Sequence, residues 1–365
     1  MYSGDQRTLY LDEAIHRRTF RDFRAVSHME LDVHAQWPFL LNTPPRAFLQ
    51  SRELPLSHLE SASSQWLLRE CERSGSPTNL ALSFQLPGWH QDPRQQYTEI
   101  QIQKLRSVYQ SPIALQRYID YMVKEIQILR GILSEEIRLS YMHWDGDLVH
   151  FLSDSELTQL MFFINRAFSG VNSPSTQLVA ELDTPPKSDD LLALLVGLGI
   201  NTVCINDPGI TNFGFPLSEL KDWIKLIRNY GISKVLLRLY LAEEISDDLS
   251  SNLADIISAA PDAVLLLRPS SVANGEVAGV PDDQIFSIKQ DLLEALYSPM
   301  TDSFYVSQNW NSTTSHLVKG IGLGAKSYTS NLEFYNTHGL TEYYQILDSG
   351  KLPIKRVQKL ITELY

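Results

Sequence analysis

The sequence predicts a protein of the α/β class, in which parallel strands alternate with helices. From about residue 80 to residue 270, short apolar runs alternate with segments of helical period, which is typical of repeated strand–helix units. The composition agrees, because hydrophobic residues make up 43% and charged residues 20% of the 365 positions, as in ordinary globular proteins. A chain of this length can bury a substantial core, as one large domain or as two.

Six strands are expected, each of them a short apolar run. They are Leu80–Leu86, Ile137–Trp144, Gln177–Leu182, Thr202–Asn206, Val235–Tyr240 and Ala263–Leu267. Six strand–helix units fit an incomplete (β/α)6 barrel, but periodicity alone does not exclude a doubly wound open sheet.

Two of the expected helices carry clear local signals. The helix over Pro112–Leu133 has one apolar stripe at spacings of three and four residues. The stripe consists of Leu115, Ile119, Met122, Ile126 and Leu129. The next helix opens with Ser153 and Glu156, a capping box in which the two residues satisfy each other's free backbone donors. Its core face consists of Leu157, Leu160, Met161 and Ile164.

Further helices are expected where the helical period returns. They are Ser188–Leu198, Leu217–Tyr230, Asp247–Ala259, Asp282–Tyr297, Thr341–Asp348 and Lys355–Tyr365.

Charge and hydropathy argue against several classes of protein. With 31 basic and 43 acidic residues the formal net charge is −12, so the averaged field repels polyanions and nucleic acid is not expected as a partner. No apolar stretch approaches the roughly 20 residues that span a bilayer, and the N-terminus lacks the apolar core of a signal peptide. We therefore expect a cytoplasmic protein. Two cysteines, Cys71 and Cys204, argue against a disulfide framework and a cysteine-based zinc site.

The segment Gly320–Arg356, GIGLGAKSYTSNLEFYNTHGLTEYYQILDSGKLPIKR, carries a resemblance. It resembles the closing segment of the oxygen-independent coproporphyrinogen oxidases, a family within the radical SAM superfamily. The resemblance implies an incomplete (β/α)6 TIM-like barrel of the radical SAM type. On that basis we expect an N-terminal extension over residues 1–78, the partial barrel over residues 79–270 and a small C-terminal subdomain over residues 271–365.

The same segment contains Gly320, Gly322 and Gly324, which invite comparison with a phosphate-binding loop. A glycine run is a weak signal without a preceding strand and a following helix in a βαβ unit. Glycines at alternate positions also permit close approach of backbones in a strand. We therefore predict that these glycines serve packing.

The cluster-binding loop of the family is altered in this chain. The family has Cys-x3-Cys-x2-Cys after a strand that ends in a proline. The matching stretch here, Leu82–Gln96, reads LSFQLPGWHQDPRQQ and places Trp89, Pro93 and Gln96 at those three positions. Because thiolates are the usual protein ligands of such clusters, we expect the iron–sulfur cluster and its radical chemistry to be absent.

The loops that hold S-adenosylmethionine in the family are also changed. A Gly-Gly-Gly-Thr-Pro run follows the second strand in the family, where this chain has the residues Asp145–Val149. The family motifs at the fourth and fifth strands are replaced by Asn201–Pro208 and Tyr240–Glu243. The acidic pair at the third strand is retained as Glu181 and Asp183, and the resemblance implies that these two residues could contact a nucleoside.

A group of histidines and aspartates occupies the altered first and second loops. The group consists of His90, Asp92, His143, Asp145, Asp147 and His150. They would lie at the C-terminal ends of two strands, where barrel enzymes place their sites, and imidazole with carboxylate can bind zinc, iron or manganese. The alternative is a solvated polar barrel mouth with a turn at Asp145-Gly146. In that alternative His143 is a buried core residue.

Aromatic residues near the same loops are candidates for stacking on a flat ligand such as a tetrapyrrole. They are Trp89, Tyr141, Trp144 and Trp310. Equally, these side chains could fill the space of the lost cluster.

These observations lead to three hypotheses about function. The leading one is a pseudoenzyme without a certain cofactor that binds either a small planar ligand, haem or porphyrin-like, or a protein partner. The rival is a repurposed enzyme that uses the His/Asp group to bind a divalent metal or as general acid and base. The third is non-radical use of S-adenosylmethionine through Glu181.

Overall fold

The structure is a computed structural model. It describes residues 49–53, 79–84, 111–145, 148–149, 152–182, 189–207, 217–240, 249–267, 282–299, 304–307, 317–328 and 332–362. These residues fall into two compact units. Unit 1 contains those up to Thr176 and those from Leu317 onward, and unit 2 contains those from Gln177 to Ser307. The predicted domain boundaries, after residues 78 and 270, lie outside the described residues and stay predictions.

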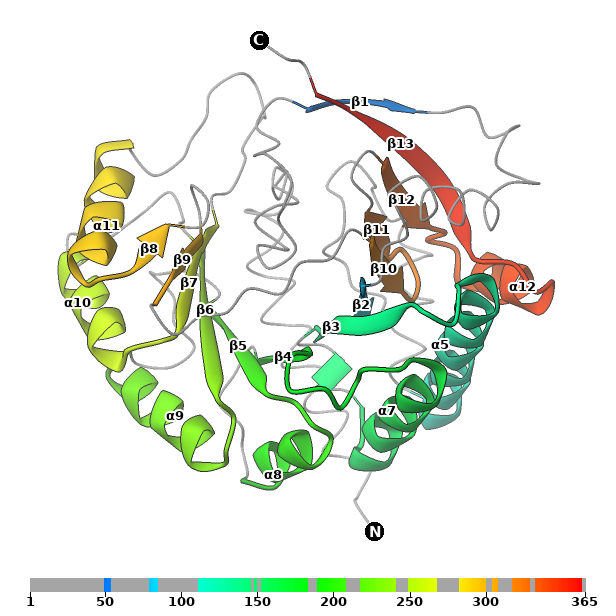
Figure 1. The fold of residues 1–365 in the computed structure, drawn as a ribbon, viewed down its shortest axis with the longest axis horizontal. Helices are drawn as coiled ribbons and strands as arrows, with labels where there is room; N and C mark the ends of the chain where they lie inside the picture. Colours follow the sequence, from blue (N-terminus) through cyan, green and yellow to red (C-terminus); the bar gives the residue numbers. More distant parts are fainter. Residues whose placement is uncertain are drawn as a thin grey trace. The chain divides into compact units, whose positions relative to one another are not determined.

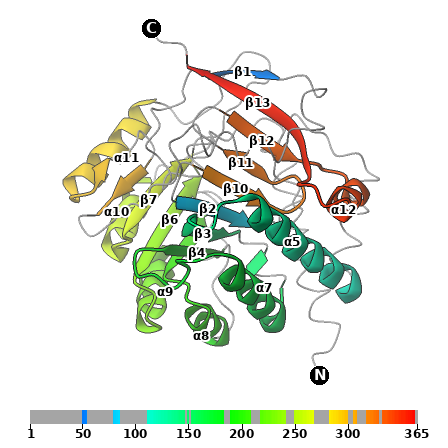
Figure 2. The ribbon, with the colours of Figure 1, turned by 45° about the vertical axis from the view of Figure 1, so that its right-hand side comes forward.

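Unit 1 is built on a mixed sheet, whose strands Figures 1 and 2 label. The strands are β1 (Leu49–Glu53), β2 (Asn79–Phe84), β3 (Arg138–Trp144), β10 (Leu317–Ile321), β11 (Lys326–Tyr328), β12 (Leu332–Asn336) and β13 (Ile354–Thr362). Their order in the sheet is β1-β13-β12-β11-β10-β2-β3. Strand β2 is parallel to both β3 and β10, and the remaining pairs are antiparallel.

Three helices belong to this unit, α5 (Pro112–Ile132), α7 (Asp154–Ala167) and α12 (Leu340–Asp348). Helix α5 begins after Ser111, whose hydroxyl accepts a hydrogen bond from Ala114 N. Its predicted apolar stripe is buried throughout. Helix α7 begins with the predicted capping box, since Ser153 N donates to Glu156 Oε2 at 2.6 Å. Helices α7 and α12 both contact α5.

Unit 2 contains a parallel sheet with an antiparallel edge. Its strands are β4 (Gln177–Leu182), β5 (Thr202–Asp207), β6 (Lys234–Tyr240), β7 (Ala263–Leu267), β9 (Phe304–Val306) and β8 (Ser298–Pro299), in that spatial order. Strands β4 to β7 are parallel, whereas β9 is antiparallel to both β7 and β8. Its helices are α8 (Asp189–Gly197), α9 (Leu217–Asn229), α10 (Leu249–Ala259) and α11 (Asp282–Glu294). Figure 1 shows α9, α10 and α11 in succession along one side of β6 and β7.

The predicted α/β class is confirmed, and each of the six predicted strands is present within two residues at either end. The helix predicted over Lys355–Tyr365 is wrong, because residues Ile354–Thr362 form strand β13. Apolar residues at Ile354, Val357 and Leu360 follow a spacing of three, which imitates a helical stripe. Strand β13 pairs with β12 on one side and β1 on the other, and these two ladders override the local pattern.

The glycine-rich segment forms the tight connection between β10 and β11. A Cβ atom at Gly320 would lie 2.2 Å from the carbonyl oxygen of Lys326, so no other residue fits there. Gly322 and Gly324 have φ angles of 114° and 68°, which disfavour residues with a side chain. The prediction that these glycines serve packing is confirmed for Gly320, whereas Gly322 and Gly324 are required by the turn that follows β10.

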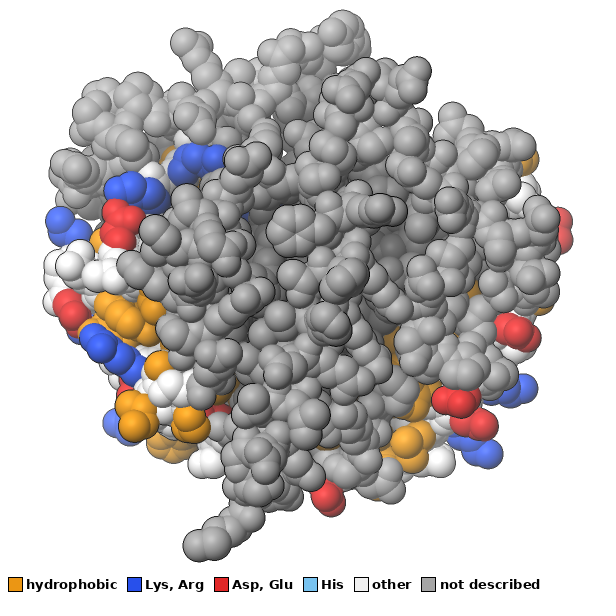
Figure 3. All heavy atoms as spheres, turned by 180° about the vertical axis from the view of Figure 1, so that it is seen from behind, with side chains coloured by type: hydrophobic (Ala, Val, Ile, Leu, Met, Phe, Trp, Pro, Cys, Tyr) orange, Lys and Arg blue, Asp and Glu red, His pale blue; other side chains and the backbone are white. Residues whose placement is uncertain are grey.

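On the face that Figure 3 shows, acidic and basic side chains of the described residues are interspersed, and hydrophobic side chains lie among them. Exposed hydrophobic residues of the described chain include Ile113 and Phe162 in unit 1 and Phe286 in unit 2. Within the described residues, no helix combines the length and the apolar character that crossing a membrane requires.

We expect Gly320→Ala to lower the free energy of unfolding by about 3 kcal/mol or more, because its methyl group would overlap a backbone oxygen that cannot rotate away. Chemical denaturation measures this change. The matched control is Gly131→Ala in α5, where no atom lies within 4 Å of the added methyl group, and which should raise stability by about 0.5–1 kcal/mol. Equal stability of the two variants would contradict the packing role of Gly320.

Candidate functional site

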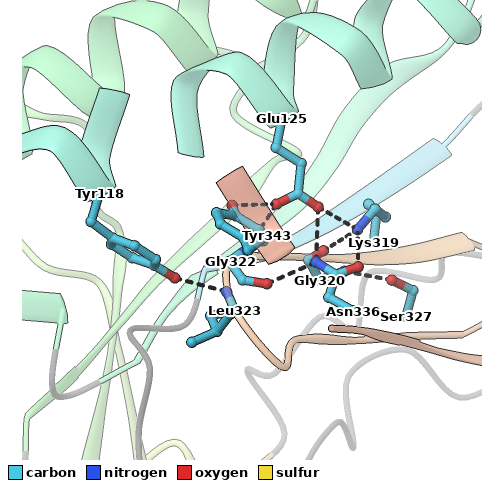
Figure 4. A network of polar contacts seen from close by, with 9 residues as sticks. All are labelled: Tyr118, Glu125, Lys319, Gly320, Gly322, Leu323, Ser327, Asn336 and Tyr343. Carbon is cyan, nitrogen blue, oxygen red and sulfur yellow. Dashed lines mark hydrogen bonds and ion pairs between the residues drawn. The ribbon is translucent and has the colours of Figure 1, made fainter. Parts of the chain in front are cut away.

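A buried ion pair joins helix α5 to strand β10 (Figure 4). Lys319 Nζ lies 2.8 Å from Glu125 Oε1, and both side chains are 0% exposed. The carboxylate also accepts hydrogen bonds from Asn336 Nδ2 at 2.9 Å, Gly322 N at 3.0 Å and Tyr343 OH at 2.7 Å. A buried carboxylate is stable only when it is paired and hydrogen-bonded in this way.

The remaining members of this network complete its hydrogen bonds. Lys319 Nζ also donates to the carbonyl oxygen of Gly320. Leu323 N donates to Tyr118 OH at 2.8 Å. Burial holds the pKa of Tyr118 and of Tyr343 well above the ordinary value for tyrosine, so both phenols stay neutral. The network therefore fixes the glycine-rich segment against α5 and has a structural role.

This ion pair also defines the two faces of the unit 1 sheet. Successive side chains on a strand point to opposite faces, and residues paired across parallel strands share a face. Lys319 points toward α5 and pairs with Leu82 of β2. Ser83 is the next residue on β2 and therefore belongs to the opposite face, together with its partner His143 on β3.

On that opposite face, residues from six neighbouring strands, five of them polar, occupy one level of the ladder. Ser83 pairs with Gly320, and the pairing of Val318 with Tyr328 places Gly320 opposite Lys326. Lys326 pairs with Tyr335, which pairs with Arg356. We call this set the polar row. It consists of His143, Ser83, Gly320, Lys326, Tyr335 and Arg356.

One end of the polar row is an aromatic ring between two cations. The guanidinium carbon of Arg356 lies 3.9 Å from the centroid of the Tyr335 ring, and Lys326 Nζ lies 5.4 Å from it. Burial and the neighbouring Glu333 carboxylate raise the pKa of Tyr335, while Arg356 acts in the opposite direction. The phenol of Tyr335 therefore stays neutral.

The predicted metal ligands are only partly described. His143 is 5% exposed on β3. Asp145 Oδ1 accepts a hydrogen bond from Leu148 N at 2.8 Å, so this carboxylate closes the turn after β3. Within the described residues, no group of three or more histidine, cysteine, aspartate or glutamate side chains could hold a metal ion. The other predicted ligands lie outside the described residues, namely His90, Asp92, Asp147 and His150.

The predicted stacking residues do not share one face. Trp144 is fully buried and pairs with Phe84, which places it on the Lys319 face of the sheet, away from the polar row. Tyr141 pairs with Ala81 and lies on the polar-row face. Trp89 and Trp310 lie outside the described residues.

In unit 2, the predicted nucleoside-binding residue Glu181 is held in an ion pair. Its Oε1 lies 2.5 Å from Arg238 Nη1, and the two residues are 5% and 8% exposed. Glu181 pairs with Cys204 across β4 and β5, and the register of β5 and β6 places Arg238 on the same face. Asp183 lies outside the described residues. The carboxylate that the family uses for a nucleoside is here neutralised by an internal cation.

Comparison with known proteins agrees with this architecture. No protein-family model matches the chain. Oxygen-independent coproporphyrinogen III oxidases of Helicobacter pylori strains 26695 and J99 are 22% and 23% identical over 282 and 290 residues. The enzyme of Pseudomonas aeruginosa is 21% identical over 286 residues. The chain is related to the oxygen-independent coproporphyrinogen III oxidases.

The two Helicobacter matches cover 66% of this chain and 61% of each relative, so the chain spans about three fifths of the length of the curated relatives. Among solved structures, the coproporphyrinogen III oxidase of Escherichia coli, described as a radical SAM enzyme, matches with a TM-score of 0.62 and 14% identity. That match covers 90% of this chain and 80% of the other. It confirms the predicted fold of the radical SAM type.

The sequence alone did not predict the two buried ion pairs, Glu125–Lys319 and Glu181–Arg238. Both had a visible signal, which is a charge inside an apolar pattern. Glu125 lies beside the apolar stripe of α5, and Lys319 interrupts the apolar strand β10. Arg238 likewise interrupts the apolar run of β6. The partner of each charge could not be read from the sequence, because pairing depends on elements far apart in the chain.

We expect Glu125→Gln and Lys319→Met each to lower the free energy of unfolding by about 3–5 kcal/mol, because each leaves one buried charge without its counterion. The double variant should cost less than the sum of the two. Chemical denaturation of all three measures the coupling. The control is Lys124→Met, also on α5, which removes the half-exposed partner of Asp348 on α12 and should change the free energy of unfolding much less, because that pair is solvated. If Glu125→Gln or Lys319→Met lowered the free energy of unfolding no more than Lys124→Met does, the structural role of the buried pair would be contradicted.

Proposed function

We propose that this chain is a relative of the oxygen-independent coproporphyrinogen III oxidases that does not perform their radical reaction and instead binds a small planar ligand, haem or porphyrin-like. The observation that carries the proposal is the loss of the cluster thiolates. Trp89, Pro93 and Gln96 stand where the family has its three cysteines, and thiolates are the usual ligands of such clusters.

The remaining cysteines support this proposal. The chain has two in total, Cys71 and Cys204. Cys204 is fully buried within β5, so its sulfur lies in the body of a sheet, whereas the family carries its cluster on a loop. Two thiols also fall one short of the three that the family motif supplies.

The pairing of Glu181 argues in the same direction. A nucleoside could use the Glu181 carboxylate only after the ion pair with Arg238 had opened. Opening it would leave a buried guanidinium without its counterion, which is costly. Non-radical use of S-adenosylmethionine through Glu181 is therefore disfavoured as the function of this chain.

The polar row favours ligand binding over simple decay of an active site. Residues drifting without a function would be expected to fill a sheet face with apolar or scattered polar groups. Here a histidine, a serine, a tyrosine and two cations share one level of the ladder. A ligand lying on such a face would meet polar side chains rather than a purely apolar surface.

Two alternatives from the sequence remain as proposals of lower rank. In the first alternative the chain binds a protein partner, and the polar row gives no argument for that function. A repurposed enzyme with a metal or acid–base site would depend on His90, Asp147 and His150 joining His143. In the described part of this loop, Asp145 already serves as the cap of a turn.

We expect anaerobic reconstitution with iron and sulfide to leave the protein without the brown absorption of a four-iron cluster, because the thiolate set is incomplete. Absorption spectra and iron content of the desalted protein measure the outcome. An oxygen-sensitive chromophore near one cluster per chain would overturn the proposal. Stoichiometric zinc, iron or manganese in protein purified without chelator, lost in His143→Ala, would favour the repurposed enzyme.

We expect titration with haem to shift the Soret band and to saturate near one haem per chain. A ligand that binds the folded state should also stabilise it, by about 2.7 kcal/mol at a free concentration one hundred times the dissociation constant. Absorption titration and chemical denaturation with and without haem measure the two effects. A shift that grows linearly without saturation, or a shift without stabilisation, would contradict specific binding.

A further inference from the structure

We propose that the exposed face of helix α11 binds a second copy of this chain, with the two α11 helices parallel and related by a two-fold axis. This inference goes beyond the proposed ligand-binding function and does not depend on it. Helix α11 (Asp282–Glu294) lies at the end of the row α9, α10, α11 in unit 2 (Figure 1). It contacts α10 and β8 within that unit.

Helix α11 carries apolar side chains on two opposite sides. Ile288 and Leu292 are buried, at 2% and 0% exposed, whereas Phe286 and Leu293 are 63% and 40% exposed. Phe286 and Leu293 are seven positions apart, so they lie within about 20° of each other around the helix. At 3.6 residues per turn this stripe lies on the side away from Ile288 and Leu292. A second, exposed apolar stripe indicates contact with another surface.

Exposed apolar residues are concentrated on this element. Besides Phe286 and Leu293, Leu296 in the turn after the helix is 69% exposed. The other large exposed hydrophobic residues of the described chain lie on three different helices, α5, α7 and α8. They are Ile113, Phe162 and Val196. Single exposed apolar residues are ordinary on a protein surface, whereas three on one helix and its following turn are typical of an interface.

The side chains beside the stripe specify how the second copy is oriented. If Phe286 and Leu293 occupy d positions of a heptad, Gln290 takes the a position, Lys289 the g position and Glu294 the e position. In a parallel pair of helices the g position faces the e position of the next heptad in the other helix, so Lys289 meets Glu294 of the second copy, twice. In an antiparallel pair each flank faces its own copy, which opposes like charges. Charge complementarity therefore favours the parallel pair.

These polar groups are available to a second copy. Lys289 is half-buried, and Gln290 and Glu294 are exposed. None of the three has a hydrogen bond or an ion pair with the residues that the structure describes. A polar residue at a single a position fixes the register of two helices, which is the role we assign to Gln290. The seam is about two heptads long, and small interfaces are typical of weak association, so we expect a dissociation constant on the order of 10–100 μM.

The test measures the mass of the full chain by sedimentation equilibrium, at concentrations from about 1 to about 500 μM. The variants Phe286→Ser and Leu293→Ser each remove one apolar side chain from the seam. The control is Phe162→Ser, which removes an aromatic side chain of similar exposure, 57%, from α7 in unit 1. Circular dichroism and chemical denaturation confirm that each variant folds.

We expect the mass of the natural chain to rise from that of one chain to that of two across this range. Phe286→Ser and Leu293→Ser should each raise the dissociation constant of the dimer at least about tenfold, because the two-fold axis removes each side chain twice. Phe162→Ser should dimerise like the natural chain.

Charge reversal tests the orientation. Lys289→Glu and Glu294→Lys should each raise the dissociation constant about three- to tenfold, because each replaces two attractive pairs by two repulsive ones. The double variant should restore the natural dissociation constant, because both pairs form again with their signs exchanged. Single reversals without effect, or a double variant that is not restored, would overturn the parallel arrangement.

A natural chain that stays monomeric over the whole range would overturn the proposal. So would a dimer that Phe286→Ser and Leu293→Ser leave unchanged, because its interface would lie elsewhere. A dimer that Phe162→Ser weakens as strongly as Phe286→Ser does would also contradict the assignment to α11.

Discussion

The ion pair between Glu125 and Lys319 is the constraint on which the rest of unit 1 depends. It is fully buried, and the carboxylate is satisfied from β10, the turn after it, β12 and α12. Since a lysine side chain can reach α5 from only one face of β10, the pair decides which face each residue of the neighbouring strands occupies. The polar row lies on the other face because of this choice. A shift of β10 by one residue would bury Gly320 toward α5 and turn Lys319 outward.

Local chemistry made much of the fold predictable. The capping box at Ser153 and the apolar stripe of α5 involve residues within one or two helical turns, and both are present. The six strands were predictable because buried parallel strands are continuous apolar runs. The segment Lys355–Tyr365 was not, because β13 is specified by its partners β1 and β12 rather than by its own pattern. The requirement for Gly320 likewise comes from Lys326 across the turn.

The candidate site was less predictable for the same reason. The sequence drew attention to His143 and Asp145 because they follow a strand, and the structure separates their roles. Asp145 caps the turn that follows β3 through a hydrogen bond from Leu148, only three positions further along the chain. His143 belongs to a row that includes Arg356, more than two hundred positions away. Pairing of strands across such distances is decided by register and topology, which single-sequence patterns do not contain. Trp144 was a candidate for stacking on a ligand because it is an aromatic residue at a strand end. It lies instead on the face of the sheet from which Lys319 points toward α5.

Charged side chains are arranged differently in the two units. In unit 2 a retained family carboxylate, Glu181, is matched by Arg238, so the pair presents little net charge to a ligand. In unit 1 the Lys326 and Arg356 cations flank a neutral ring beside a single described carboxylate, Glu333. The buried Glu125–Lys319 pair keeps the sheet of unit 1 in register, whichever polar residues the opposite face carries.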